Sequence, residues 1–409
     1  MKVEVLDNGL VIIIDPIKEF ESVACSLIIT GGMVADLPDT VGASLILTEL
    51  LNRGAGDLSH IDYAEFVDSL GARLWQECFY DRFTLSAICY HRRLTDVLKL
   101  LSLKVRVPRL PESELSSIKN SLLQQIEAVK DSPSDLALER LNALYFNPPY
   151  NRSLLGDSSG LHQATYENIT DIWSRCFKPN GSILSLAGKI AIDDALQLSK
   201  ELFGDWQGEA EALPEIVTAT RWSYKHIDYN SEQTQVAIIL PGYNLEHPLY
   251  FAALVYTKIM SNGLVGRLFI EVREKRGLAY SVYLSDNIVH NYGYFLLYAG
   301  TTADRATETL DVIKETITTA TLGNITANEI LRAKNGLKTS LTLASQSAQS
   351  RAVANAKHWF KLGKLLTLAE MLQKVNDVTL DQIQQVAEAV DFKSGSVLTL
   401  GGRALNLDS

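Results

Sequence analysis

Cysteine and proline are scarce in this chain, which has 4 Cys and 11 Pro among its 409 residues. The cysteines form no Cys-x-x-Cys pair, and Cys25 and Cys89 lie in apolar, strand-like runs. We therefore expect buried free thiols, and neither a disulfide framework nor a thiolate metal site. The low proline content and the lack of low-complexity runs argue against long disordered segments.

Long hydrophobic runs are also missing, since none approaches the ~18 residues that a membrane-spanning helix needs. The N-terminus enters an alternating strand pattern at once, with a turn at Asp7–Gly9. It has no basic leader and no small-residue cleavage site of the kind that signal peptides carry. We expect no transmembrane helix, no membrane partner and a cytoplasmic location.

Positive charge is in deficit: 38 Lys and Arg face 48 Asp and Glu, a formal net charge of -10. This balance argues against a nucleic-acid partner. Walker A and Gly-x-Gly-x-x-Gly loops are absent from the sequence. The Gly-x-Ser-x-Gly string at Gly156–Gly160 follows a loop with Pro-Pro and Asn-Arg instead of a strand. It therefore predicts a polar turn and not a nucleophile elbow.

Histidine is too dispersed along the chain to build a metal site. A catalytic zinc ion needs three protein ligands, and zinc peptidases place two His four residues apart on one helix face. No two of the seven His lie within five residues of one another. We therefore expect this chain to bind no metal and no other cofactor.

The sequence does contain an approximate internal repeat, with an offset of roughly two hundred residues. The first half predicts a strand, two helices, two strands and a helix, in the order Ser22–Thr30, Gly42–Arg53, Tyr63–Leu70, Ala72–Phe79, Phe83–His91 and Arg92–Val107. The second half predicts the same order, in Thr234–Leu240, Leu249–Ser261, Gly266–Arg276, Ala279–Ser285, Tyr292–Gly300 and Ala303–Ala320.

This repeat predicts an α+β fold of two homologous domains, since 409 residues exceed one ordinary core. We place the domains at 1–206 and 222–409, joined by an acidic, proline-bearing linker at 207–221. Many strands follow one another directly and amphipathic helices lie between them. This mixture predicts a mostly antiparallel sheet in each domain, covered by helices on one face.

Several segments give the chain a resemblance to the pitrilysin-type (M16) zinc metallopeptidases, in particular to the subunit type of mitochondrial processing peptidase. The segments that carry the resemblance include Leu6–Pro16, Phe146–Asp157 and Gly266–Tyr283, of which the last is the most specific. The resemblance extends over nearly the whole chain and implies two domains of the LuxS/MPP-like fold.

The catalytic helix of that family carries His-x-x-Glu-His, and the helix Gly42–Arg53 occupies its place here. The alignment implies that every zinc ligand and the general base are replaced. A third ligand, a Glu in the family, falls on a glutamine, and a neutral amide is a poor zinc ligand beside a carboxylate. The substituted positions are Leu45, Thr48, Glu49 and Gln125, with Gln124 as the neighbouring alternative to Gln125.

The family's second functional element is an Arg and a Tyr with six residues between them, and it falls on Arg273 and Tyr280. In the family this pair contacts the substrate near the scissile bond, where a guanidinium or a phenol can donate to a developing oxyanion. A structural alternative is an Arg that complements a helix C-terminus and a Tyr buried in a strand. The intact segment Gly266–Tyr283 favours the functional interpretation.

The resemblance implies a subunit that is inactive alone and essential to a heterodimeric M16B-type zinc peptidase. The partner, a subunit with His-x-x-Glu-His, would hold zinc and cleave unfolded peptides or oligopeptides, and this chain would contribute Arg273 and Tyr280. Two alternatives stay open: a non-enzymatic scaffold like the core proteins of a respiratory complex, and a homodimeric, chaperone-like peptide-binding chamber.

Overall fold

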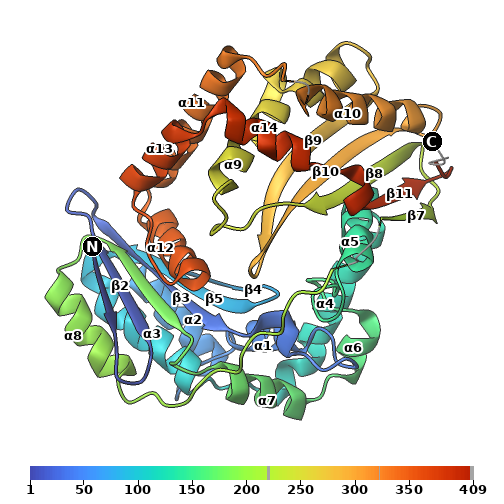
Figure 1. Cartoon of the computed structure of the whole chain (residues 1–409). Helices are drawn as coiled ribbons and strands as arrows, with labels where there is room; N and C mark the ends of the chain where they lie inside the picture. Colours follow the sequence, from blue (N-terminus) through green and yellow to red (C-terminus); the bar gives the residue numbers. More distant parts are fainter. Residues whose placement is uncertain (219–221, 322, 406–409) are drawn as a thin grey trace. The chain divides into compact units, whose positions relative to one another are not determined.

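The computed structural model describes residues 1–218, 222–321 and 323–405, which form two compact units. Unit 1 comprises Met1–Glu127, Leu154–Glu215 and Leu343–Leu366. Unit 2 comprises Ala128–Ser153, Ile216–Thr342 and Thr367–Ser409. Each unit is built on one β-sheet with helices packed on it (Figure 1). The α+β fold class predicted from the sequence is therefore confirmed.

Unit 1 contains a six-stranded sheet in the order β1-β2-β6-β3-β5-β4. The pair β2·β6 is parallel and the other neighbours are antiparallel, as the sequence predicted for most of the sheet. In sheet order the strands are Lys2–Val5, Val11–Pro16, Ile183–Gly188, Ser22–Thr30, Arg82–Tyr90 and Arg73–Cys78.

One face of this sheet packs on the main core of unit 1. Alternate residues of β3, namely Val23, Cys25, Leu27 and Ile29, point into this core because successive side chains of a strand face opposite sides. Cys25, Cys89 and Cys176 are buried free thiols and Cys78 is half-buried, as expected. The helices on this face are α1 (Ala43–Leu50), α2 (His60–Leu70), α3 (Leu94–Arg106), α4 (Leu115–Lys130), α6 (Ser158–Gln163), α7 (Tyr166–Cys176) and α8 (Ile192–Phe203).

The opposite face of the sheet is covered by α12 (Ala348–Leu362), which comes from the second half of the sequence (Figure 1). Small residues allow its close approach: Ala352 of α12 lies in one buried cluster with Ala24 of β3 and Ala187 of β6. Arg351 of α12 forms a two-pronged ion pair with the buried Asp15, with nitrogen–oxygen distances of 2.8 and 2.9 Å.

Unit 2 contains a five-stranded sheet in the order β7-β11-β8-β10-β9, with β7 and β11 parallel. In that order the strands are Ser223–Asp228, Ser396–Gly401, Gln233–Pro241, Tyr292–Thr302 and Ala279–Val289. The helices of its main core are α9 (Tyr250–Met260), α10 (Ala306–Thr321), α11 (Ala327–Ala344), α13 (Leu368–Asp377) and α14 (Leu380–Ala389). The helix α5 (Pro133–Tyr145) packs on β8 and β11.

The two sheets share one topology. The order β2-β6-β3-β5-β4 in unit 1 corresponds strand for strand to β7-β11-β8-β10-β9 in unit 2, and β1 is an addition to the first sheet. The internal repeat predicted from the sequence therefore exists in the fold. The expectation that helices cover one face of each sheet was incomplete, because α12 in unit 1 packs on the second face.

The compact units differ in extent from the predicted ranges 1–206 and 222–409, because α12 belongs to unit 1 and α5 to unit 2. In the predicted linker, residues 207–218 form isolated bridges but no helix or ladder strand, and 219–221 lie outside the described residues.

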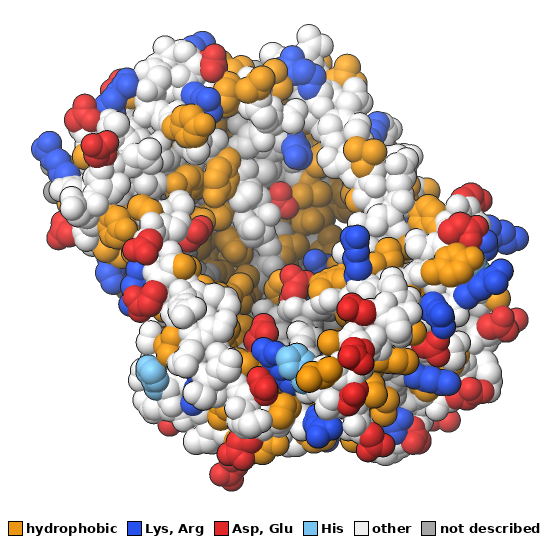
Figure 2. Space-filling view, turned by 180° about the vertical axis from the view of Figure 1, so that it is seen from behind, with side chains coloured by type: hydrophobic (Ala, Val, Ile, Leu, Met, Phe, Trp, Pro, Cys, Tyr) orange, Lys and Arg blue, Asp and Glu red, His pale blue; other side chains and the backbone are white. Residues whose placement is uncertain are grey.

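No helix in the described part of the chain is long and apolar enough to cross a bilayer. Acidic and basic side chains are interspersed on the face drawn in Figure 2.

The ion pair between Arg351 and Asp15 yields a first prediction. The substitution Arg351→Met leaves a nearly buried carboxylate without its cation and is expected to lower the free energy of unfolding by about 2–3 kcal/mol. Urea denaturation at pH 7 measures the loss. Arg332→Met, at an exposed arginine of α11, serves as the control. A loss no greater than that of the control would contradict the role assigned to the ion pair.

Candidate functional site

The segment that carries Arg273 and Tyr280 begins with a helix of unusual form. The sequence predicts an ordinary helix over Gly266–Arg276, but Phe269–Glu274 forms a π-helix, η5. In it the Lys275 N–H donates to the Ile270 carbonyl, five residues back, at 2.9 Å. Such π-turns are rare, and they often occur at functional sites because the extra residue redirects side chains.

The structure brings Arg273 and Tyr280 together, as the sequence predicted. The guanidinium carbon of Arg273 lies 5.0 Å from the ring centre of Phe269 and 4.8 Å from that of Tyr280. Its Nη1 donates to the Tyr280 carbonyl at 2.8 Å. The two rings therefore hold the guanidinium in one orientation through cation–π contacts.

This geometry disagrees with the structural alternative for the pair. Tyr280 is 75% exposed, so it is not a core aromatic. Arg273 donates to a strand carbonyl and not to the last carbonyls of its own helix. Within the described residues, its remaining guanidinium donors and the Tyr280 hydroxyl have no hydrogen-bond partner. Both groups are thus available to a ligand, and whether they bind substrate stays a prediction.

The C-terminal end of the segment is fixed by backbone hydrogen bonds. Gly277 has φ +57°, the left-handed conformation expected for a residue that follows a helix. The Gly277 N–H donates to the Arg273 carbonyl at 2.9 Å, and the Leu278 N–H donates to the Val272 carbonyl at 2.8 Å. Arg305 adds a contact that the sequence did not predict, since it donates to the carbonyls of residues 276 and 277, each at 2.8 Å.

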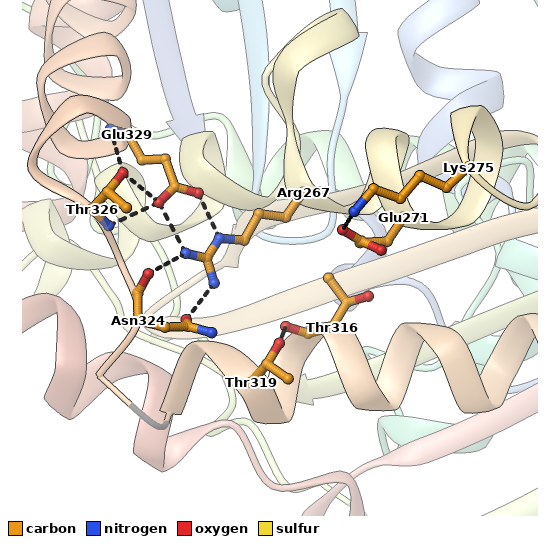
Figure 3. A network of polar contacts seen from close by, with 8 residues as sticks. All are labelled: Arg267, Glu271, Lys275, Thr316, Thr319, Asn324, Thr326 and Glu329. Atoms are coloured by element: carbon orange, nitrogen blue, oxygen red, sulfur yellow. Dashed lines mark hydrogen bonds and ion pairs between the residues drawn. The ribbon is translucent and has the colours of Figure 1, made fainter.

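The N-terminal end of the segment is fixed by a half-buried ion pair, drawn in Figure 3. Arg267 donates to both carboxylate oxygens of Glu329 at 2.6 and 2.9 Å, and to the side chain and carbonyl of Asn324 at 2.8 and 2.9 Å. Burial raises the pKa of Glu329, but hydrogen bonds from Arg267 and Thr326 outweigh it and lower that pKa to about 2. Sixty-two residues separate the pair, so sequence spacing gave no signal for it.

A cavity of about 390 Å³ lies beside this ion pair. Glu271 lies at its wall and binds two cations: Lys275 Nζ lies 2.7 Å from one carboxylate oxygen, and Arg276 Nη1 donates to the other at 2.8 Å. The residues that line the cavity are Arg267, Ile270, Glu271, Arg276, Glu315, Thr316, Thr319, Asn324 and Glu329.

The helix expected at the metal position, α1 in unit 1, holds no ligand set. Leu45 is half-buried and apolar, and Glu49 is exposed. The Thr48 hydroxyl is buried and donates to the Ser44 carbonyl at 2.8 Å. Gln125 on α4 is an exposed neutral amide. Within the described part of the chain, no three His, Cys, Asp or Glu side chains form a group that could hold a metal ion. These residues do not fit zinc.

A buried ammonium group lies next to α1. Lys104 of α3 is 2% exposed, and its Nζ donates to Asn52 Oδ1 at 2.8 Å and to Gln76 Oε1. The Gln76 amide in turn donates to the Thr48 carbonyl. Burial lowers the pKa of Lys104 to about 7, although the Glu49 carboxylate acts in the opposite direction. Sequence patterns did not predict this network, because its members come from α1, the turn after it, β4 and α3.

Lys104 yields a prediction for the pH dependence of stability. Burial in the folded chain lowers its pKa from the ordinary 10.5 to about 7, so the unfolded chain binds more protons between these values. Stability should therefore rise with pH across that window because of this group. Lys104→Met is expected to flatten the rise in the urea midpoint from pH 7 to 10. Lys99→Met, exposed on the same helix, should keep the rise. Equal slopes in the two variants would contradict the assignment.

Known proteins resemble this chain along its full length. It is 26% identical over 413 residues to the uncharacterized zinc protease YmxG of Bacillus subtilis, with 98% of each chain covered. It is 25% identical to an uncharacterized zinc protease of Rickettsia felis, with 94% of this chain and 93% of that protein covered.

Two solved structures share the fold. A peptidase M16 inactive domain from Pseudomonas fluorescens superposes with a TM-score of 0.91 at 22% identity, covering 99% of this chain and 98% of that one. A protease from Helicobacter pylori gives 0.89 at 18% identity, covering 98% and 99%. Two family models match in succession, "Insulinase (Peptidase family M16)" over residues 12–158 and "Peptidase M16 inactive domain" over 163–337. This chain therefore belongs to peptidase family M16.

Proposed function

We propose that this chain is the non-catalytic subunit of a heterodimeric M16B-type zinc peptidase that acts on unfolded peptides, with the cytoplasm as the expected compartment. The observation that carries the proposal is the Arg273–Tyr280 pair. Its guanidinium is held between two rings and keeps donors open, and its phenol is 75% exposed. The replaced positions on α1 and α4 leave this chain without a metal or a general base of its own.

In this proposal, a partner subunit with His-x-x-Glu-His supplies the metal and the general base. Arg273 then binds a peptide carbonyl through its free guanidinium donors and fixes the peptide's register. The Tyr280 hydroxyl donates to the carbonyl oxygen where negative charge develops. Donors of this kind contribute most when the protein positions them beforehand. The ring contacts and the anchored ends of the segment provide that rigidity.

The firm anchoring of the segment supports a functional role for the pair. Arg267 and Glu329 fix one end, and Arg305 fixes the other. A scaffold protein needs a stable core, but it has no need of an exposed tyrosine stacked on an arginine with open donors. The scaffold and homodimer alternatives predict no partner-dependent cleavage, and the following experiment distinguishes them from the proposal.

The test is cleavage of a quenched fluorescent peptide by this chain, by a His-x-x-Glu-His-bearing M16 subunit of the same organism, and by their mixture. Activity is expected in the mixture only. Tyr280→Phe should lower kcat about 10- to 100-fold, since it removes a donor to the developing oxyanion. Arg273→Ala should lower kcat by a similar factor, because the peptide loses the contact that fixes its register. Lys275→Ala, exposed on the same segment, should have little effect.

Two outcomes count against this proposal. Chelator-sensitive cleavage by the chain alone would contradict the subunit role. Unchanged kcat in both the Arg273 and the Tyr280 variants would remove the site assignment.

A further inference from the structure

Cationic side chains gather at the β4–β5 turn of unit 1, far in sequence from the Arg273 segment. Asp81 lies in this turn and is 2% exposed. One of its oxygens lies 2.6 Å from Arg82 Nη1, and the other lies 2.6 Å from Lys361 Nζ of α12. Two cations thus flank this one buried carboxylate.

Lys357 adds a third cation, one helical turn before Lys361 on α12. It is exposed, and no ion-pair or hydrogen-bond partner is found for it in the described ranges. Like charges four residues apart on a helix repel each other. Incomplete hydration of the ammonium beside the sheet and the Arg82 guanidinium both lower the pKa of Lys357, while Glu77 acts in the opposite direction. Lys357 therefore lies in a positive local environment that a further anion would relieve.

The charges near this turn leave a positive excess. Arg82, Lys357 and Lys361 carry three positive charges, and Asp81 and Glu77 carry two negative ones. Burial lowers the pKa of His358 on the same helix, which favours its neutral form. A local excess of positive charge is notable in a chain whose net charge is -10.

A purely structural role accounts for part of the cluster only. Lys361 neutralises Asp81 and lies in the last turn of α12, where a cation complements the helix C-terminus. Arg82 also binds Asp81. Lys357 does neither, because it precedes the last turn and contacts no carboxylate at ion-pair distance. Its position beside two other cations needs a different explanation.

Aromatic rings contact two of the three cations, Arg82 and Lys361. The Arg82 guanidinium lies 4.1 Å from the ring centre of Phe79, and Lys361 Nζ lies 5.0 Å from that of Phe360. Phe79 follows directly on β4, the edge strand of the sheet, whose ladder pairs with β5 alone. An extended peptide can add to such an edge through backbone hydrogen bonds.

We propose that the Arg82–Lys357–Lys361 cluster is a carboxylate-binding subsite for peptide ligands. Lys357 contacts the carboxylate directly, and Arg82 and Lys361 supply the surrounding positive potential. The carboxylate is either the C-terminus of the peptide or an Asp or Glu side chain. The inference depends on the proposed function only in taking a peptide as the ligand.

The test measures the binding of three N-terminally labelled peptides to the full chain by fluorescence anisotropy, without any partner. One short Ala/Val/Ser peptide has a free C-terminus, the second is its amide, and the third is the amide with one internal Glu. A carboxylate should tighten binding about five- to tenfold relative to the neutral amide, the size of a charge-assisted hydrogen bond near the surface.

Two variants locate the effect. Lys357→Gln should reduce the preference for a carboxylate to within about twofold, because the contacting charge is lost. Lys364→Gln removes an exposed charge just beyond α12 and should leave the preference intact. Both side chains are exposed, so both variants are expected to fold, which the Tm checks. A third variant, Glu77→Gln, should increase the preference by removing a competing carboxylate.

The outcomes decide the proposal. Preference for the free acid alone assigns the C-terminus, preference for the Glu peptide alone assigns a side chain, and either supports the subsite. Equal binding of all three peptides, no measurable binding of either carboxylate peptide, or a preference that survives Lys357→Gln would overturn it. A chain without this carboxylate preference could still support partner-dependent cleavage that requires Arg273. The test of the subsite can therefore fail without contradicting the proposed subunit role.

Discussion

Apolar side chains on both faces of a sheet impose the constraint on which unit 1 depends. The inner strands β2, β3 and β6 are buried on both sides, so one layer of helices leaves a second apolar face in water. The helix α12 covers that face, and its Arg351 satisfies the buried Asp15. The same helix places Lys357 and Lys361 beside the β4–β5 turn. Burial of the second face therefore also creates the positive cluster.

The two halves of the chain share one sheet topology but place different side chains at the two predicted elements of the site. In unit 1, α1 has a leucine, a threonine and an exposed glutamate at the positions where we expect the family's ligands and base, and the Lys104 network lies next to α1. In unit 2, the π-helix η5 carries the Arg273 guanidinium and the start of β9 carries the Tyr280 phenol, on a segment that is fixed at both ends. The absence of metal ligands at the expected positions on α1 and the presence of the Arg273–Tyr280 pair both support the proposed role, a subunit that completes the site of another chain.

Much of this was predictable from the sequence, and the exceptions have a common cause. Strand alternation and helical spacing predicted the repeat and the α+β class, because both patterns reflect contacts between residues close together in the sequence. The resemblance of the segment Gly266–Tyr283 to the family pointed to Arg273 and Tyr280 as a candidate pair. The ion pair of Arg267 and the packing of α12 on the sheet of unit 1 join residues that lie far apart in the chain. Local spacing in the sequence does not encode such contacts. The π-turn at Phe269–Glu274 shifts one hydrogen bond within a pattern that reads as an ordinary helix.

We propose that this chain completes a metal site held by another subunit. Zinc content and peptide cleavage, measured together while this chain is titrated into a His-x-x-Glu-His-bearing M16 subunit, test it most directly. We expect no zinc in the purified chain, cleavage that rises to a plateau at equimolar ratio, and a zinc content per partner subunit that stays constant. Stoichiometric zinc in this chain alone, or cleavage by the partner that does not change as this chain is added, would contradict it.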